Sequence, residues 1–212
     1  MLLDTIAATV TSERIVSRSR FLATLAPVAD ETDADACIAA VRRQHPGARH
    51  HGVAMVLGPE GQRQRSSDDG EPAGTTGAPM LAVLRGAALT DVVAVVTRYF
   101  GGTLLGAGGL VRAYSGTLSD ALDGVQRVAR VPVVVCRIRT DHAEAGRLEH
   151  RLHGWARERD AVVAPGRYDA AGAQFEVTVA VGEEQALAAM LAAGGHDHRF
   201  EQDTPVLQPR VR

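Results

Sequence analysis

A run of β-branched residues that ends in a glycine-rich turn and then enters a helix constrains the fold more than any other feature of this chain. Residues 91–100, DVVAVVTRYF, have the composition of a buried strand, and residues 101–125 lead from glycines into an amphipathic pattern. An earlier strand-like stretch, residues 19–28, is followed by a helical pattern over residues 30–47 with acidic residues in its first turn. Strands alternating with helices predict an α/β arrangement for the first part of the chain.

The second part of the chain shows a different alternation. Its segments predict the order β-α-β-β-α-β, the split βαβ order of ferredoxin-like domains. The boundary is predicted near residues 124–130, which divides the chain into a domain of residues 1–126 and a domain of residues 127–212. The whole chain is therefore predicted to be an α+β protein with two two-layer domains. The predicted strands and helices of the second domain are residues 131–139, 141–154, 159–169, 173–181, 183–195 and 198–207.

Composition excludes several classes of function. The 212 residues are 45% hydrophobic and carry 23 basic against 25 acidic side chains, so the chain has no general attraction to nucleic acid or membrane and any such binding must use a local patch. All the basic residues are Arg, which excludes a Schiff-base lysine and the lysine of a P-loop. Cys37 and Cys136 form no metal-binding or disulfide pattern. The sequence shows no leader pattern and no long apolar run, so we expect the protein to lie in the cytoplasm and to have no membrane partner. The sequence does not indicate an oligomeric state.

The strongest candidate site surrounds the glycine-rich turn. Its glycines allow backbone N–H groups to approach a ligand, the helix N-terminus favours anions, and two arginines could clamp a phosphate. The alternative is that the glycines serve tight turns and that Tyr99 and Phe100 are core residues. The spacing lacks the G-x-G-x-x-G fingerprint of dinucleotide-binding folds. The residues of this candidate site are Arg98, Tyr99, Phe100, Gly101, Gly102, Gly106, Gly108, Gly109 and Arg112.

A second candidate lies in residues 58–79, a stretch that is rich in Gly and Pro and is predicted to be a long loop. Asp68, Asp69 and Glu71 could hold a cation or face arginines across a groove, although the spacing is not that of an EF-hand; the alternative is a solvated turn. The histidines show no metal-ligand spacing, and Ser115 does not stand in a nucleophile elbow. The sequence therefore predicts no catalytic residue, no metal and no cofactor.

Four segments together resemble one family. SRF at residues 19–21, A-x-H at 48–50, SDDGEPAGTTGAP at 67–79 and VVTRYFGGTLLGAGGLVRAYS at 95–115 are similar, in order and interval, to the YigZ/IMPACT family. The resemblance implies a first domain of the ribosomal-protein domain 2-like fold, similar to domain IV of elongation factor G. It implies a ferredoxin-like second domain similar to domain V of that factor.

The same resemblance carries expectations about function. Family members are thought to bind RNA or to act on translation, and eukaryotic members regulate initiation through a kinase-activating partner; no established enzymatic activity comes with the family. We therefore expect a non-catalytic, translation-associated regulator that binds RNA or the ribosome through the glycine- and arginine-rich surface. A regulator that binds a translation factor or stress kinase, and a phosphoryl-transfer enzyme with Mg²⁺ on Asp68 or Asp69, are the alternatives. The resemblance places a second surface, for a partner or a cation, at Asp68, Asp69, Gly70, Glu71, Pro72 and His50.

Overall fold

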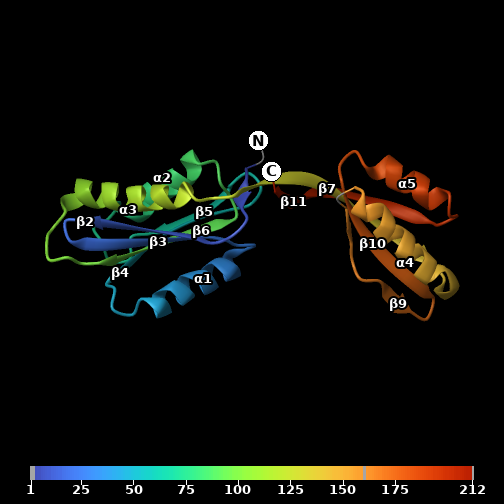
Figure 1. Cartoon of the computed structure of the whole chain (residues 1–212), viewed down its shortest axis with the longest axis horizontal. Coiled ribbons are helices and arrows are strands. Elements are labelled where there is room, and N and C mark those ends of the chain that lie inside the picture. The colour runs from blue at the N-terminus through green and yellow to red at the C-terminus, as the bar shows by residue number, and fades with distance from the viewer. Residues whose placement is uncertain (1–2, 160, 212) are drawn as a thin grey trace. The chain divides into compact units, whose positions relative to one another are not determined.

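The chain folds into two compact units, each built from strands and helices (Figure 1). A computed structural model describes residues 3–159 and 161–211. The division falls between residues 130 and 131, and residues 209–211 at the end of the last strand are grouped with the first unit. The fold is thus a mixed α/β fold of two domains.

An antiparallel sheet of five strands forms the centre of the first unit, in the order β2-β3-β6-β4-β5. Its strand β6 is the predicted β-branched strand, and helix α3 is the predicted helix that follows the glycine-rich turn. A short additional strand, β1, pairs with the beginning of β7. The elements of this unit are β1 (Thr5–Ile6), β2 (Val10–Val16), β3 (Ser19–Pro27), α1 (Glu31–Gln44), β4 (His50–Leu57), β5 (Arg63–Ser67), α2 (Gly77–Gly86), β6 (Val92–Tyr99) and α3 (Gly106–Leu122).

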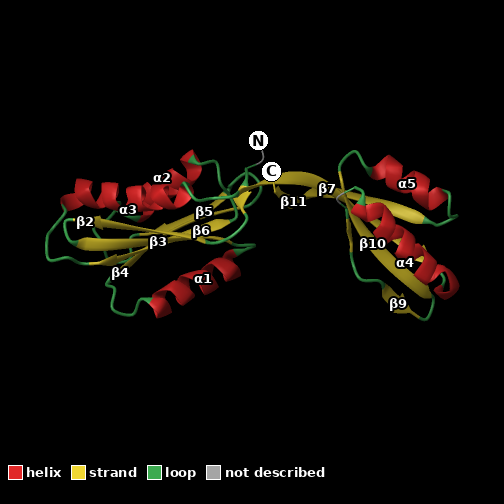
Figure 2. Ribbon diagram, in the orientation of Figure 1, coloured by secondary structure: helices red, strands yellow, loops and turns green. Residues whose placement is uncertain are grey.

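Helices cover both faces of this sheet, so the first unit has three layers and the prediction of two was wrong for it. Figure 2 shows α1 on one side of the strands and α2 with α3 on the other. Val93 and Val95 of β6 pack in the core beneath α1, whereas Ala94 and Val96 pack in the core formed with α2 and α3. Since both faces are buried, the strand is apolar at almost every position instead of alternating. This explains why β6 was predictable as a continuous apolar run.

The stretch of residues 58–79 differs from the predicted long loop. It contains strand β5, which pairs with β4 from Val53↔Ser67 to Leu57↔Arg63, and it ends in the first turn of α2. All five residues of β5 are exposed, so an edge strand of polar residues produced no apolar pattern to indicate it. Two loops remain, residues 58–62 between β4 and β5 and residues 68–76 between β5 and α2.

The second unit has the predicted order of elements. Its sheet has β7 in the middle, with β11 on one side and β10 on the other, and both β8 and β9 pair with β10. Strands β8 and β9 are two pieces of the single strand predicted over residues 159–169, separated at Ala164–Gly166. The elements are β7 (Arg127–Thr140), α4 (His142–Arg157), β8 (Val162–Val163), β9 (Arg167–Asp169), β10 (Gly172–Ala180), α5 (Glu184–Ala192) and β11 (His198–Val211). In the described part of the chain, none of the helices is long and apolar enough to cross a bilayer.

Candidate functional site

A cavity of about 460 Å³ opens in the first unit where β6 ends and α3 begins. The start of β4, the loop of residues 68–76 and the glycine-rich turn also contribute to it. Six predicted site residues line this cavity together, although they come from three separate segments of the sequence. Its lining residues are Arg49, His50, Glu71, Pro72, Arg98, Phe100, Leu104, Leu105, Gly106, Ala107 and Leu110.

A buried ion pair lies at the base of the cavity. Arg98 donates from Nη1 to Glu71 Oε1 over 2.7 Å, and the side chains are only 7% and 4% exposed. The same oxygen accepts from the Tyr114 hydroxyl over 2.8 Å. Burial, reinforced by the Glu71 carboxylate, raises the pKa of Tyr114, so the phenol remains a hydrogen-bond donor. The pair therefore ties β6 and α3 to the loop of residues 68–76.

The guanidinium of Arg98 also organises aromatic rings. Its Cζ lies 5.5 Å from the centre of the Phe21 ring and 5.4 Å from that of Phe100, within cation–π range. Nη2 is 3.4 Å from Ser19 Oγ, and Nε has no hydrogen-bond partner among the described atoms. Arg98 thus fixes the orientation of the exposed Phe100 ring from below.

The turn after Phe100 requires glycine. A Cβ on Gly101 would lie 2.0 Å from the carbonyl carbon of Arg18, and the Gly101 N–H donates to Ser19 Oγ over 3.1 Å. Gly102 has a φ of +83° and Gly106 a φ of +68°, both in the left-handed region that other residues rarely adopt. The glycines set the path of the turn, and the start of α3 is placed beside the end of β6.

The outer wall of the cavity is apolar and cationic. Phe100 is 46% exposed and Leu104 is 88% exposed, and Arg49 reaches the same cavity from the segment before β4. Helix α3 starts without a side-chain cap and without an acidic residue in its first turn. Its N–H groups and positive dipole end are available to an anion. The wall combines a surface for a planar ring with positive charge for a phosphate.

The acidic side chains are engaged by the protein itself. Asp68 accepts from the N–H groups of Gly74, Thr76 and Gly77 over 2.7–2.9 Å. Partial burial favours a higher Asp68 pKa, but the three N–H donors outweigh it and lower the pKa below its ordinary value. Asp69 pairs with Arg42 through Oδ1 over 2.6 Å and accepts from the His51 N–H through Oδ2.

These contacts occupy both oxygens of Asp68 and of Asp69. The described residues contain no cluster of three or more His, Cys, Asp or Glu side chains that could hold a metal ion. The geometry assigns the two carboxylates to the structure of the loop of residues 68–76.

The other predicted residues occupy different places. His50 lines the cavity, and its Nδ1 lies 2.9 Å from the Asp69 carbonyl oxygen, which can only accept, so Nδ1 is the protonated nitrogen. The Tyr99 hydroxyl lies 3.0 Å from His45 Nδ1, outside the cavity. Arg112 lines a separate hollow of about 350 Å³ with Arg14, and Leu104 and Leu105 border both hollows. Gly108 and Gly109 form the first turn of α3, and Gly70 turns the loop beside His50 with a φ of +83°.

Sequence reasoning missed part of the lining. Arg49, Leu104, Leu105, Ala107 and Leu110 complete the cavity. Arg49 is the middle residue of the A-x-H segment, and Leu104 and Leu105 stand between the glycines, so their positions inside these segments were the available signal. Their contact with one cavity depends on the pairing of β4 with β6, which no local pattern specifies.

Comparison with known proteins assigns the chain to a family. The Impact N-terminal domain matches residues 17–122, which is the segment that holds the cavity. The chain belongs to the IMPACT family. It is 43% identical over 148 residues to the IMPACT family member YigZ of Escherichia coli, covering 69% of this chain and 72% of that protein.

Two further relatives extend this comparison. The IMPACT family member YvyE of Bacillus subtilis is 41% identical over 140 residues; the match covers 66% of this chain and 64% of YvyE, less than two thirds of its length. The crystal structure of a hypothetical protein aligns with 96% of this chain and 100% of its own, at 35% identity and a TM-score of 0.75. The two-domain fold is therefore shared with an experimental structure.

Proposed function

We propose that this IMPACT family member is a cytoplasmic, translation-associated regulator whose first unit binds RNA at the cavity between β6 and α3. The observation that carries the proposal is the meeting of an exposed aromatic ring, an exposed arginine and an uncapped helix N-terminus in one cavity. Aromatic rings stack on unpaired bases, and cations with backbone N–H groups hold phosphates. The role in translation is the one that the resemblance to the family implies.

Each element of the cavity has a part in this binding. A base stacks on Phe100, while Arg49 and the first turn of α3 face the adjacent phosphates. Arg98 is a positioning residue, because Glu71 neutralises much of its charge and its guanidinium supports the Phe100 ring. Arg112, on the neighbouring hollow, contacts a more distant phosphate of the same strand.

The proposal includes the fold relationships that the family resemblance implies. The first unit corresponds to domain IV of elongation factor G, and the second to the ferredoxin-like domain V. The strand order β11-β7-β10 with β8 and β9 outermost supports the second correspondence.

Sedimentation with ribosomes and polarisation of a labelled single-stranded oligoribonucleotide test this proposal. Phe100→Ala should weaken RNA binding about 5- to 150-fold, the range expected for loss of one stacked base. Arg49→Ala should weaken binding and reduce the salt slope by about 0.7 for a single strand. Ile15→Ala removes another exposed apolar side chain and Arg85→Ala another exposed arginine, both outside the cavity, and neither should change binding.

Two results would argue against RNA binding here. If Phe100→Ala and Ile15→Ala bind RNA equally well, the cavity is not part of the RNA-binding surface. Association with ribosomes that survives nuclease treatment, without affinity for the oligoribonucleotide, would favour a protein partner. Arg98→Ala is unsuitable as the deciding variant, since it leaves Glu71 buried without its cation.

A further inference from the structure

The sheet of the second unit has one face without a described helix. Cys136 and Ile138 of β7 and Phe175 and Val177 of β10 pack in one core with the buried residues of α4 and α5. Because side chains alternate along a strand, the residues between them point to the opposite face. That face carries polar side chains, and the cross-strand pairing places Arg139 opposite Gln174 and Gln174 opposite Arg167.

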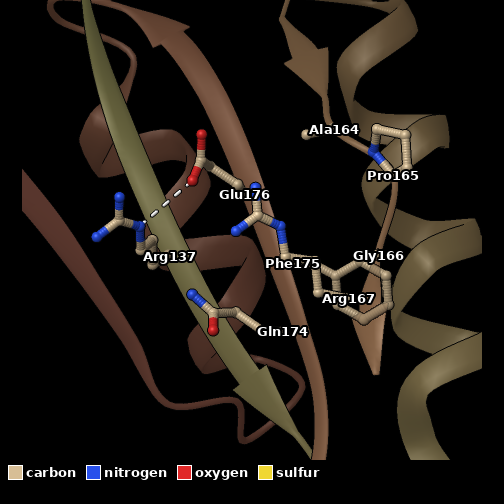
Figure 3. Close-up of a pocket in the computed structure, with 8 residues that line it drawn as sticks. All are labelled: Arg137, Ala164, Pro165, Gly166, Arg167, Gln174, Phe175 and Glu176. Carbon is tan, nitrogen blue, oxygen red and sulfur yellow. Dashed lines mark hydrogen bonds and ion pairs between the residues drawn. The ribbon is translucent and has the colours of Figure 1, made fainter. Parts of the chain in front are cut away.

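A polar hollow of about 770 Å³ lies on this face, where β8 and β9 are separated. Figure 3 shows that Arg137, Gln174, Glu176 and Arg167 gather around it. The Phe175 ring closes one end beneath Gly166, where a Cβ would approach that ring to 2.6 Å. Glycine at this position therefore lets the backbone pass close to the Phe175 ring.

This face carries more arginines than acidic side chains that pair with them. Arg137 is bound by Glu176, with Nε and Oε2 3.3 Å apart, and by Glu201. Arg139, Arg167 and Arg199 form no ion pair with any side chain that the structure describes, and all three are exposed. Period-two alternation puts Arg199 on the same side as Glu201. The face thus offers three guanidinium groups without an ion-pair partner among the described side chains, on β11, β7 and β9, with β10 between the last two.

We propose that this open face of the second unit binds the phosphodiester backbone of single-stranded RNA. Guanidinium groups bind phosphates in bidentate fashion, and the amide of Gln174 adds a donor between Arg139 and Arg167. The one aromatic ring that lines the hollow, Phe175, is fully buried, so bases have no stacking surface there. The binding is therefore electrostatic and independent of base sequence. This proposal depends on different residues from those that line the cavity of the first unit.

The test uses the intact chain and a labelled oligouridylate of about 20 nucleotides, with polarisation measured over a range of salt. Arg139→Ala/Arg167→Ala should weaken binding and lower the salt slope by about 1.4, as expected for two phosphate contacts on a single strand. Glu176→Gln should tighten binding, because it removes a negative charge from the hollow. Arg147→Ala/Arg157→Ala removes two exposed arginines from α4, on the helix side, and should leave the affinity and slope near those of the wild type.

A second pair of variants separates this proposal from RNA binding by the first unit. In an Arg49→Ala/Phe100→Ala background the second unit should retain salt-dependent binding, and adding Arg139→Ala/Arg167→Ala should abolish it. If the added substitutions change nothing, or if the wild type does not bind the oligouridylate at low salt, the open face is not an RNA surface. If only Arg139 and Arg167 matter, the proposal for the first unit fails and this one stands.

Discussion

Among single residues, Glu71 has the greatest predicted effect on stability. Glu71→Gln leaves the buried Arg98 guanidinium without a counter-charge, and breaking a buried pair costs about 3–5 kcal/mol. Arg20→Ala breaks a pair with Glu13 that is exposed and screened by solvent, so its cost should be much smaller. Urea unfolding measures both variants. A Glu71→Gln cost no larger than that of Arg20→Ala would contradict the buried pair.

The two cysteines differ in predicted reactivity. Cys136 is fully buried, and burial raises the pKa of its thiol to about 12, so only about one molecule in ten thousand carries the thiolate at pH 8. In a Cys37→Ala variant, native protein should resist iodoacetamide at pH 8, while protein unfolded in urea should react fully. Mass spectrometry counts the added groups. Modification of native protein as fast as of unfolded protein would show that Cys136 is accessible.

Sequence reasoning was strongest for residues whose type alone indicates their structural role. It was weakest for residues whose role depends on a contact with a residue distant in the sequence. The glycines of the turn after β6 were recognisable, because close approach and positive φ favour glycine. Arg98 was expected to contact a phosphate, and acidic side chains that face arginines were one possibility for Glu71. Which arginine Glu71 meets could not be predicted, because the two residues stand 27 positions apart and meet only through the fold. A sequence shows that an arginine ends a buried strand, but the folded chain decides whether it faces a phosphate or a carboxylate.

At the scale of elements, the start of α2 depends on Asp68. The carboxylate accepts three N–H groups around the first turn, and Asp68→Asn should lower stability at pH 7 by about 1–2 kcal/mol. Since the folded-state pKa lies below the ordinary value of 3.8, this stability is present above pH 4 and is lost as the pH falls through the folded-state pKa. The wild type and variant should therefore converge in acid.

Thermal unfolding between pH 7 and pH 2.5 measures this convergence. Glu60→Gln, at an exposed turn residue, serves as the control and should show little difference at any pH in this range. A constant gap between wild type and Asp68→Asn down to the lowest pH would show that the charge of Asp68 is not what stabilises the helix start.

Burial determines which elements could be predicted. Strand β6 is covered on both faces and is apolar over most of its length, and α3 has an amphipathic pattern, so local composition indicated both elements. Strand β5 is exposed at every position and is stabilised by pairing with β4, which leaves no local signal. Leu104 stands inside a recognised segment, but no local pattern shows that it shares a cavity with residues of β4 and of the loop of residues 68–76.

At the scale of the whole molecule, the two proposed RNA surfaces belong to one chain and should act together on a long ligand. When both surfaces bind the same strand, the second contact forms at the effective concentration set by the linked units, which raises affinity without new contacts. Wild-type affinity should therefore rise at least about a hundredfold between an oligouridylate of about 8 nucleotides and one of about 40.

Variants that lack one surface test the origin of this gain. Phe100→Ala/Arg49→Ala and Arg139→Ala/Arg167→Ala should each show a much shallower dependence on length, close to the increase expected from the number of overlapping sites alone. Fluorescence polarisation at fixed salt measures all three proteins with both ligands. If both surfaces bind the same strand, removing either one should abolish the gain in affinity with length. The same length dependence in wild type and in both variants would therefore mean that the two surfaces bind RNA separately.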